Sequence, residues 1–140
     1  MKCAVVTGGS RGIGRAICKK LAVELGYHVL INYQGNEEAA KETLAALKDE
    51  GATGEIIKFN VGDLTDVKQA LQRWSDHHPE AIVEVIVNNA GIAVPAPLIH
   101  QATDDFRHQL EVNLVGQLAV TQAVLLCAPT ALRSRHRTFL

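Results

Sequence analysis

The feature that most constrains this chain is a fourfold alternation of short apolar runs with longer helical patterns. The apolar runs are rich in β-branched residues, as expected of strands, and cover Cys3–Val6, His28–Ile31, Glu55–Phe59 and Val83–Val87. The helical patterns after them cover Ile13–Leu25, Glu37–Glu50, Thr65–Trp74 and Thr103–Leu126. Strands that alternate with helices pair in parallel through right-handed crossovers. The order therefore predicts a doubly wound α/β fold, with helices on both faces of a parallel sheet.

The ends of the expected helices follow from their apolar faces and capping residues. The first helix stops at Gly26 and has one apolar face, formed by Ile13, Ala16, Ile17, Leu21 and Leu25. Gly51 is the expected C-cap of the second helix, and Thr65 and Thr103 are the expected N-caps of the third and fourth. Aromatic residues make up only 4% of the chain, so we expect a core of Val, Ile, Leu and Ala.

A glycine-rich turn joins the first strand to the first helix. Its sequence is Thr7-Gly8-Gly9-Ser10-Arg11-Gly12-Ile13-Gly14, and a helix follows at once. Glycine lets the backbone turn tightly and approach a pyrophosphate without an obstructing Cβ. The free N–H groups of a helix N-terminus then favour phosphate. The turn from Gly8 to Gly14 is therefore a candidate nucleotide-binding site; the alternative is a glycine-rich connection that binds no ligand.

Three motifs in the expected order resemble the short-chain dehydrogenase/reductase family. Thr7-Gly8-x-x-x-Gly12-x-Gly14 is similar to the TGxxxGxG motif of that family. Asn88-Asn89-Ala90-Gly91 stands directly after the fourth strand, like a second family motif, and Asn113 resembles the helix-borne catalytic Asn. The resemblance covers residues 1 to about 126. It implies a Rossmann-like domain at residues 1–126 that binds NADP(H) and serves an oxidoreductase.

The resemblance also implies roles for individual residues outside the glycine turn. Asn89, Ala90 and Gly91 are expected to line the ribose of the cofactor, and Asn88 is expected to tie neighbouring strands together. Asn60 and Val61, which close the third strand, are expected beside the adenine. Asn113 is the one expected catalytic residue.

The choice between NAD and NADP depends on the end of the second strand. A carboxylate there would bond to the ribose 2′-OH of NAD and repel a 2′-phosphate. The chain has Asn32 and Tyr33 at this position and no acid before Glu37. Arg11 offers a planar guanidinium that suits a phosphate dianion; the alternative is that Arg11 is a solvated loop cation. The combination favours NADP(H), with Asn32 and Tyr33 among the binding residues.

The remaining catalytic residues of the family are not found in the sequence. Family chemistry needs a Ser and a Tyr-x-x-x-Lys pair, in which the Lys lowers the pKa of the Tyr. Tyr27 is followed four residues later by Ile31, and Tyr33 by Glu37. We therefore expect a sheet truncated after about four strands. Three interpretations stay open: a reductase completed by another chain, an inactive NADP(H)-binding module, or a nonfunctional truncated product.

The resemblance is to different branches of the family in different segments. Three segments are most similar to bacterial 3-oxoacyl-(acyl-carrier-protein) reductases, namely Met1–Gly14, the strand end Asn32-Tyr33 and Phe59–Asp63. This implies a small-molecule or acyl-carrier-bound ketone as substrate and a role in fatty acid biosynthesis. Residues from Ile92 onward are closer to other reductases. Residues 127–140 lose the resemblance and form a divergent basic tail with three Arg; a frameshift and simple divergence are both open. The strand at Val83–Val87 is expected to be an open apolar edge, and the monomer only marginally stable.

Composition narrows the possible partners and compartment. A net charge of −1 gives no reason to expect nucleic acid. No apolar stretch is expected to approach the ~20 residues of a membrane helix, and no signal peptide is evident at Met1-Lys2. Three cysteines without paired spacing indicate reduced thiols in a cytoplasmic protein. No metal site is expected, and the helix 103–126 offers a surface for a homo-oligomer.

Overall fold

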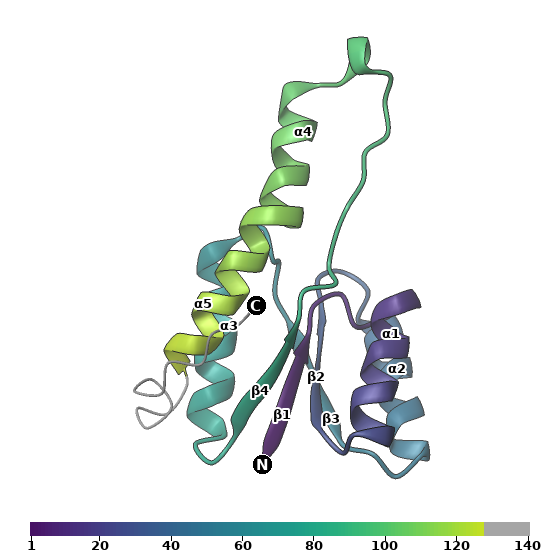
Figure 1. Ribbon diagram of the computed structural model, residues 1–140, viewed down its shortest axis with the longest axis vertical. Coiled ribbons are helices and arrows are strands. Elements are labelled where there is room, and N and C mark those ends of the chain that lie inside the picture. Colours follow the sequence, from purple (N-terminus) through teal and green to yellow (C-terminus); the bar gives the residue numbers. More distant parts are fainter. Residues whose placement is uncertain (128–140) are drawn as a thin grey trace.

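The structure, a computed structural model, describes residues 1–127 and places four parallel strands in one sheet (Figure 1). In spatial order the sheet runs β3-β2-β1-β4, with β1 at Lys2–Val6, β2 at His28–Tyr33, β3 at Gly54–Lys58 and β4 at Ile82–Val87. Cys3 lies opposite His28, and Val6 lies opposite Ile31. Against β4 the register shifts between Cys3 and Ala4. All four predicted strands are confirmed.

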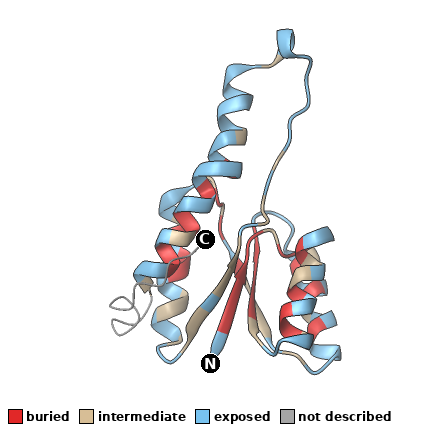
Figure 2. Ribbon diagram, in the orientation of Figure 1, coloured by how far each residue is buried: buried red, intermediate tan, exposed pale blue. Residues whose placement is uncertain are grey.

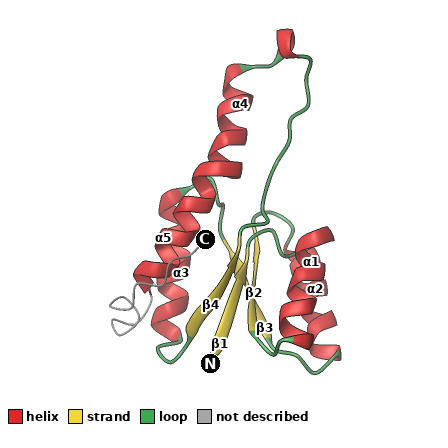
Figure 3. Cartoon of the chain, in the orientation of Figure 1, coloured by secondary structure: helices red, strands yellow, loops and turns green. Residues whose placement is uncertain are grey.

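Helices cover both faces of the sheet (Figure 3). One face carries α1 (Gly12–Lys19), its π-helical continuation η1 (Lys20–Glu24) and α2 (Glu37–Asp49). The other face carries α3 (Leu64–His77) and α5 (Gly116–Cys127). A short 3-10 turn η2 (Leu98–His100) precedes α4 (Thr103–Leu110), and a π-helical turn η3 (Glu111–Val115) joins α4 to α5. The predicted doubly wound α/β fold is confirmed.

Alternate side chains of β1 supply two separate cores, because neighbouring residues of a strand point to opposite faces. Cys3 and Val5 pack with Phe59, Leu71 and Val120 under α3 and α5. Ala4 and Val6 pack under α1 and α2, with a cluster that includes Cys18, Leu21, Val29, Ile31 and Leu47. The four inner residues of β1 are completely buried (Figure 2). A strand covered on both faces has to be apolar throughout, as this one is.

The apolar face predicted for the first helix is wrong in part. Ile13 is 76% exposed and Leu25 is 59% exposed, and Ala16 is exposed as well. Leu21 is buried as predicted, and the small residues Gly14, Cys18 and Ala22, which the prediction did not include, are buried with it. The small residues let the start of α1 approach the glycine turn, and Ile13 is left at the mouth of the cavity described below.

Two predicted N-caps are also wrong by one or two residues. The α3 cap is Asp63, whose Oδ1 accepts hydrogen bonds from the N–H groups of Thr65 at 2.9 Å and Asp66 at 3.0 Å. A carboxylate next to a helix N-terminus also interacts favourably with the helix dipole. The residue before α4 is Ala102, and Thr103 is the first residue of that helix. Gly51 follows the C-cap Glu50 of α2 with φ at +75°, a conformation that glycine adopts readily.

The helix from Thr103 to Cys127 is long and apolar enough to cross a membrane, judged by length and composition alone. The expectation that no apolar stretch approaches this length is therefore wrong. Some of the apolar side chains of this helix are buried in the core of the protein. Its residues Ala119, Val120, Ala123 and Val124 are buried, and α5 packs along α3.

Within residues 1–127, β4 forms one edge of the sheet, as expected, and its side chains are only partly buried. Beyond β4 the chain extends away from the sheet as an arm (Figures 1 and 2). The arm is defined as residues 91–110 and contains η2 and α4. Leu98, Ile99 and Phe106 of the arm are exposed. The basic tail lies outside the described residues except for Cys127, so the division into residues 1–126 and 127–140 stays a prediction.

Candidate nucleotide-binding site

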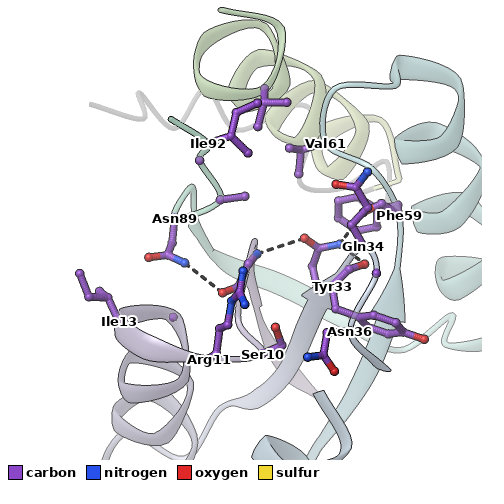
Figure 4. A pocket seen from close by; sticks show the side chains of 17 residues that line it. Ser10, Arg11, Ile13, Tyr33, Gln34, Asn36, Phe59, Val61, Asn89 and Ile92 are labelled. Carbon is purple, nitrogen blue, oxygen red and sulfur yellow. Dashed lines mark hydrogen bonds between the residues drawn. The ribbon is translucent and has the colours of Figure 1, made fainter. Parts of the chain in front are cut away.

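A cavity of about 550 Å³ opens at the carboxyl ends of the four strands (Figure 4). The chain reverses its direction across the sheet between β1 and β4, and such a reversal in a doubly wound sheet is where ligands bind. Polar residues of the glycine turn and of the β2 end lie on one side, and apolar residues of the β3 and β4 ends lie on the other. The lining comprises Gly8, Ser10, Arg11, Ile13, Gly14, Asn32, Tyr33, Gln34, Gly35, Asn36, Phe59, Val61, Asn89, Ala90, Gly91, Ile92 and Val112.

The carbonyl groups of the glycine turn are held by the protein. Asn89 Nδ2 donates to Gly8 O at 3.1 Å. Ser10 O accepts from Arg15 Nη2 at 3.1 Å and from Thr43 Oγ1 at 2.8 Å. The N–H of Arg15 reaches back to Arg11 O at 3.2 Å. The carbonyl oxygens of Gly8, Ser10 and Arg11 are therefore all hydrogen-bonded within the protein.

The N–H groups at the start of α1 remain available to a ligand. The first turn of a helix has no internal acceptors for its N–H groups, and among the described residues no side chain caps α1. Ile13 and Gly14 of this turn line the cavity. Together with the helix dipole, unpaired amides at a helix N-terminus form a site for an anion, and for phosphate in particular.

Three glycines of the turn, Gly8, Gly9 and Gly14, stand where a side chain does not fit without strain. A Cβ on Gly14 would lie 2.2 Å from Gly8 O and 2.6 Å from Asn89 Nδ2. Gly8 has φ at +62°, and its Cβ would lie 3.1 Å from Ala90 Cα. Gly9 lies below the turn, where a Cβ would meet Cys18 Sγ at 2.8 Å, and Gly12 has open space around it. Gly9 and Gly12 therefore shape the turn from outside the cavity lining.

Asn32 holds the turn from beneath. Its side chain is buried, and Oδ1 accepts from Gly8 N–H at 3.1 Å while Nδ2 donates to Phe59 O at 3.0 Å. The backbone carbonyl of Asn32 accepts from Gly9 N–H at 2.9 Å. With both ends of its amide engaged, Asn32 connects the ends of β1 and β3. The sequence placed Asn32 at the site but did not reveal this connecting role.

Thr7 and Asn89 join the ends of β1 and β4. Asn89 Nδ2 donates to Thr7 O at 2.9 Å. The buried Thr7 hydroxyl accepts from the N–H groups of Asn89 and Ala90, each at 3.0 Å. The family resemblance implied that Asn88 connects the neighbouring strands, whereas in the structure the side chain that makes this connection is that of Asn89. This connection leaves Ala90 and Gly91 along the wall of the cavity.

The two residues expected beside the adenine lie in different places. Val61 lines the cavity, and so does Phe59, which the sequence reasoning missed. Asn60 caps the following turn instead. Its Oδ1 accepts from Gly62 N–H at 2.9 Å, and its own N–H donates to Asp66 at 2.7 Å. The alternation Phe59-Asn60-Val61 is the signal that could have identified Phe59. In extended backbone, alternate side chains point to the same side, so Phe59 is expected on the same side as Val61.

Asn113 lies in η3 and faces the strand-like segment after Gly91. Its Oδ1 accepts from Ile92 N–H at 2.8 Å, and its Nδ2 donates to Ile92 O at 2.8 Å. A Cβ on Gly91 would lie 3.3 Å from Asn113 Oδ1. Asn113 thus anchors the base of the arm to the long helix at the cavity wall, although it does not itself line the cavity.

Charge at the site comes from few groups. Arg11 is the cationic residue of the cavity lining, and the lining contains no acid. Tyr33 is nearly buried, and burial raises its pKa, with Glu37 adding to the effect. Glu37 pairs with Lys41 at 2.9 Å, and that contact lowers the pKa of the carboxyl. Among residues 1–127, no group of three His, Cys, Asp or Glu side chains is placed to hold a metal ion.

Comparison with curated proteins gives relatives that are reductases or dehydrogenases by name. A 3-oxoacyl-[acyl-carrier-protein] reductase FabG of Staphylococcus aureus is 35% identical over 134 residues, which cover 96% of this chain and 52% of the relative. A 3beta-hydroxysteroid dehydrogenase 1 of Eggerthella lenta is 32% identical over 120 residues, covering 84% of this chain and 44% of the relative. The chain therefore spans about half the length of the curated relatives it matches.

Solved structures agree with these relatives. A short chain dehydrogenase from Burkholderia cenocepacia in complex with NADP has a TM-score of 0.79 at 34% identity, with 88% of this chain and 49% of that chain covered. A gluconate 5-dehydrogenase from the same organism, in complex with NADP and tartrate, has a TM-score of 0.77 at 34% identity, covering 88% and 47%. The family model of short chain dehydrogenases matches residues 2–131. The chain belongs to the short chain dehydrogenase family.

Proposed function

We propose that this chain binds a nicotinamide dinucleotide at the cavity, with its diphosphate on the amides at the start of α1. The observation that carries the proposal is the start of α1, which no side chain of residues 1–127 caps and whose Ile13 and Gly14 line the cavity. The glycine turn before it is held in place by Asn89, which donates to Gly8 O. A Cβ at Gly8 or Gly14 would disturb this turn. The turn is therefore arranged before any ligand arrives, which lowers the entropic cost of binding. The two similar structures solved in complex with NADP support a nicotinamide dinucleotide as the ligand.

We propose NADP(H) as the preferred form. The rim at the β2 end is formed by Tyr33, Gln34 and Asn36, none of which is acidic. Arg11 adds a positive charge to the same cavity. A guanidinium binds a phosphate dianion through charge-assisted hydrogen bonds. The nearest acid along the chain, Glu37, lies outside the cavity lining and is paired with Lys41.

A binding experiment tests both proposals. Titration of the folded chain with NADPH and NADH by calorimetry should give a dissociation constant at least tenfold lower for NADPH. Arg11→Ala should weaken NADPH by roughly tenfold, about 1.4 kcal/mol, since one charge-assisted contact is lost, and should leave NADH within twofold. Lys20→Ala, which removes a cation from the far end of α1, is the matched control and should change neither. Equal affinities for NADPH and NADH in the unmodified chain would remove the NADP(H) preference.

We further propose that the chain serves an oxidoreductase that reduces a ketone to a secondary alcohol. A bound nicotinamide supplies the hydride in such a reaction. Likeness to 3-oxoacyl-[acyl-carrier-protein] reductases favours a small-molecule or acyl-carrier-bound ketone, fatty acid biosynthesis and a cytoplasmic location. Asn113, which the family resemblance implies to be catalytic, is proposed as a positioning residue that acts through the segment at Ile92 held by its amide. The exposed apolar residues of the arm and the long helix favour a homo-oligomer.

A second candidate is a module that binds NADP(H) without turnover. The observation that favours it concerns the two tyrosines, Tyr27 and Tyr33, neither of which is followed by Lys four residues later. Tyr33 is nearly buried at the end of β2. Oxidation of NADPH with an acetoacetyl thioester distinguishes the two candidates. Turnover by the purified chain would support the reductase, whereas binding without turnover would support the module.

A further inference from the structure

The carbonyl of Ser10 is the most firmly held group of the glycine turn, and α2 takes part in holding it. Thr43 lies in the middle of α2, is fully buried, and its Oγ1 is 2.8 Å from Ser10 O. Arg15 reaches from α1 across to the same atom, with Nη2 at 3.1 Å. Arg15 Nε also donates to Thr43 Oγ1 at 2.7 Å. The two side chains and the carbonyl form a closed network between α1, α2 and the turn.

This network fixes the peptide group between Ser10 and Arg11. All peptide bonds of the described residues are trans, and a trans peptide directs its C=O and N–H to opposite sides. Because Ser10 O points into the network, the N–H of Arg11 points away from it, and the position from which the Arg11 side chain leaves the backbone is fixed with the same peptide group. Arg11 itself is extended, with φ at −156° and ψ at 171°, and it lines the cavity while Arg15 and Thr43 do not.

We infer that Arg15 and Thr43 are positioning residues for Arg11, and that through Arg11 they set the preference for a ribose 2′-phosphate. The inference rests on the proposed function, in which Arg11 takes that phosphate. The diphosphate is held by different groups, the amides at Ile13 and Gly14, which do not depend on this peptide. Loss of the network should therefore weaken NADPH much more than NADH, a selective effect that general destabilisation would not produce.

Thr43→Val is the most informative variant, because it keeps the shape of the side chain and removes its hydroxyl. Thr121→Val is the matched control. Within the described part of the chain, Thr121 Oγ1 bonds only to the carbonyl four residues earlier in its own helix. Thr43 makes the same kind of bond, to Ala39 O at 3.1 Å. Thr43→Ser restores a hydroxyl and should recover binding. We expect Thr43→Val to weaken NADPH about tenfold and NADH less than twofold, with Thr121→Val unchanged.

A second pair of variants keeps the inference testable if Thr43→Val does not fold. Arg15 has a side chain that is 40% exposed, and it pairs with Glu42 at 3.2 Å. Arg15→Gln removes the donor to Ser10 O, whereas Glu42→Gln removes only the exposed ion pair and is its control. Arg15→Gln should lower the ratio of NADPH to NADH affinity, and Glu42→Gln should not.

The outcomes separate the inference from the proposed function. If the unmodified chain binds neither NADPH nor NADH, the proposed function fails. If it prefers NADPH and folded Thr43→Val and Arg15→Gln keep that preference unchanged, the positioning role is wrong. An equal loss of affinity for NADPH and NADH in both variants would also overturn the positioning role. The variants would then act on the amides that bind the diphosphate, which both cofactors share.

Discussion

Replacing Gly14 by Ala sets two opposite effects against each other at one position. Gly14 lies in the first turn of α1, where Ala is favoured over Gly by about 1 kcal/mol through helix propensity. The new Cβ, however, would lie 2.2 Å from Gly8 O and 2.6 Å from Asn89 Nδ2. The first of these atoms belongs to the backbone, so the turn itself must move.

The steric effect should win. Forcing a methyl group into a filled space costs about 1–3 kcal/mol, and loss of the hydrogen bond from Asn89 to Gly8 O adds about 1 kcal/mol. After the gain in helix propensity, the net loss is about 1–3 kcal/mol of unfolding free energy. In a chain of this size each kcal/mol corresponds to about 3–5 °C in Tm. The affinity for NADPH should fall at the same time, because the displaced turn leads into the amides at the start of α1 that are proposed to bind the diphosphate.

Thermal and urea unfolding of Gly14→Ala and Gly35→Ala provide the test. Gly35 is the control, because a Cβ there would meet nothing within 4 Å and its φ is not in the left-handed region. Its unfolding free energy should change by no more than about 0.5 kcal/mol. A Gly14→Ala variant with a raised Tm and unchanged NADPH affinity would show that helix propensity dominates, and would refute the close approach described above.

Three further predictions concern buried polar and ionisable groups. Asn32→Ala leaves Gly8 N–H and Phe59 O without partners and should cost about 2–4 kcal/mol; urea unfolding that gives no loss would contradict its connecting role. Burial lowers the pKa of His28 from its ordinary 6.5, so the neutral form is favoured in the folded state and stability should be full above pH 6.5 and fall as the pH drops below it. Unfolding between pH 7.5 and 5.5 should show a slope that His28→Gln removes, and an unchanged slope would assign it to other groups. Burial raises the pKa of Cys3 to about 11 and of Cys18 to about 12; both thiols should resist a disulfide reagent at pH 8 until the chain unfolds, and fast modification in the folded state would contradict their burial.

The order of elements could be predicted from the sequence because the pattern of apolar residues carries it. The central strand β1 is apolar from Cys3 to Val6, which matches a strand covered on both faces. The exact face of α1 could not be predicted in the same way. A rule that places large apolar residues inward selected Ile13 and Leu25, whereas close packing of α1 on the turn required Gly14 and Cys18 there. Tertiary contact at close range outweighed hydrophobicity.

The site was predicted in outline for a similar reason. Parallel strands bring their carboxyl ends to one edge, so residues that follow β1, β2, β3 and β4 had to meet. The sequence did not show which of them face the cavity and which hold others in place. Asn32, Asn89 and Thr43 act through hydrogen bonds to backbone atoms 24 to 82 residues away along the chain. Such bonds depend on three-dimensional position and leave no local pattern.

The central claim is that the amides of Ile13 and Gly14 receive the diphosphate of the dinucleotide. Proton–nitrogen NMR spectra of isotope-labelled chain, recorded during titration with NADPH, observe these amides directly. The claim predicts that the signals of Ile13 and Gly14 move furthest and saturate together with the affinity measured by calorimetry. Saturable binding that leaves these signals in place and moves those of the arm or of α3 would contradict it.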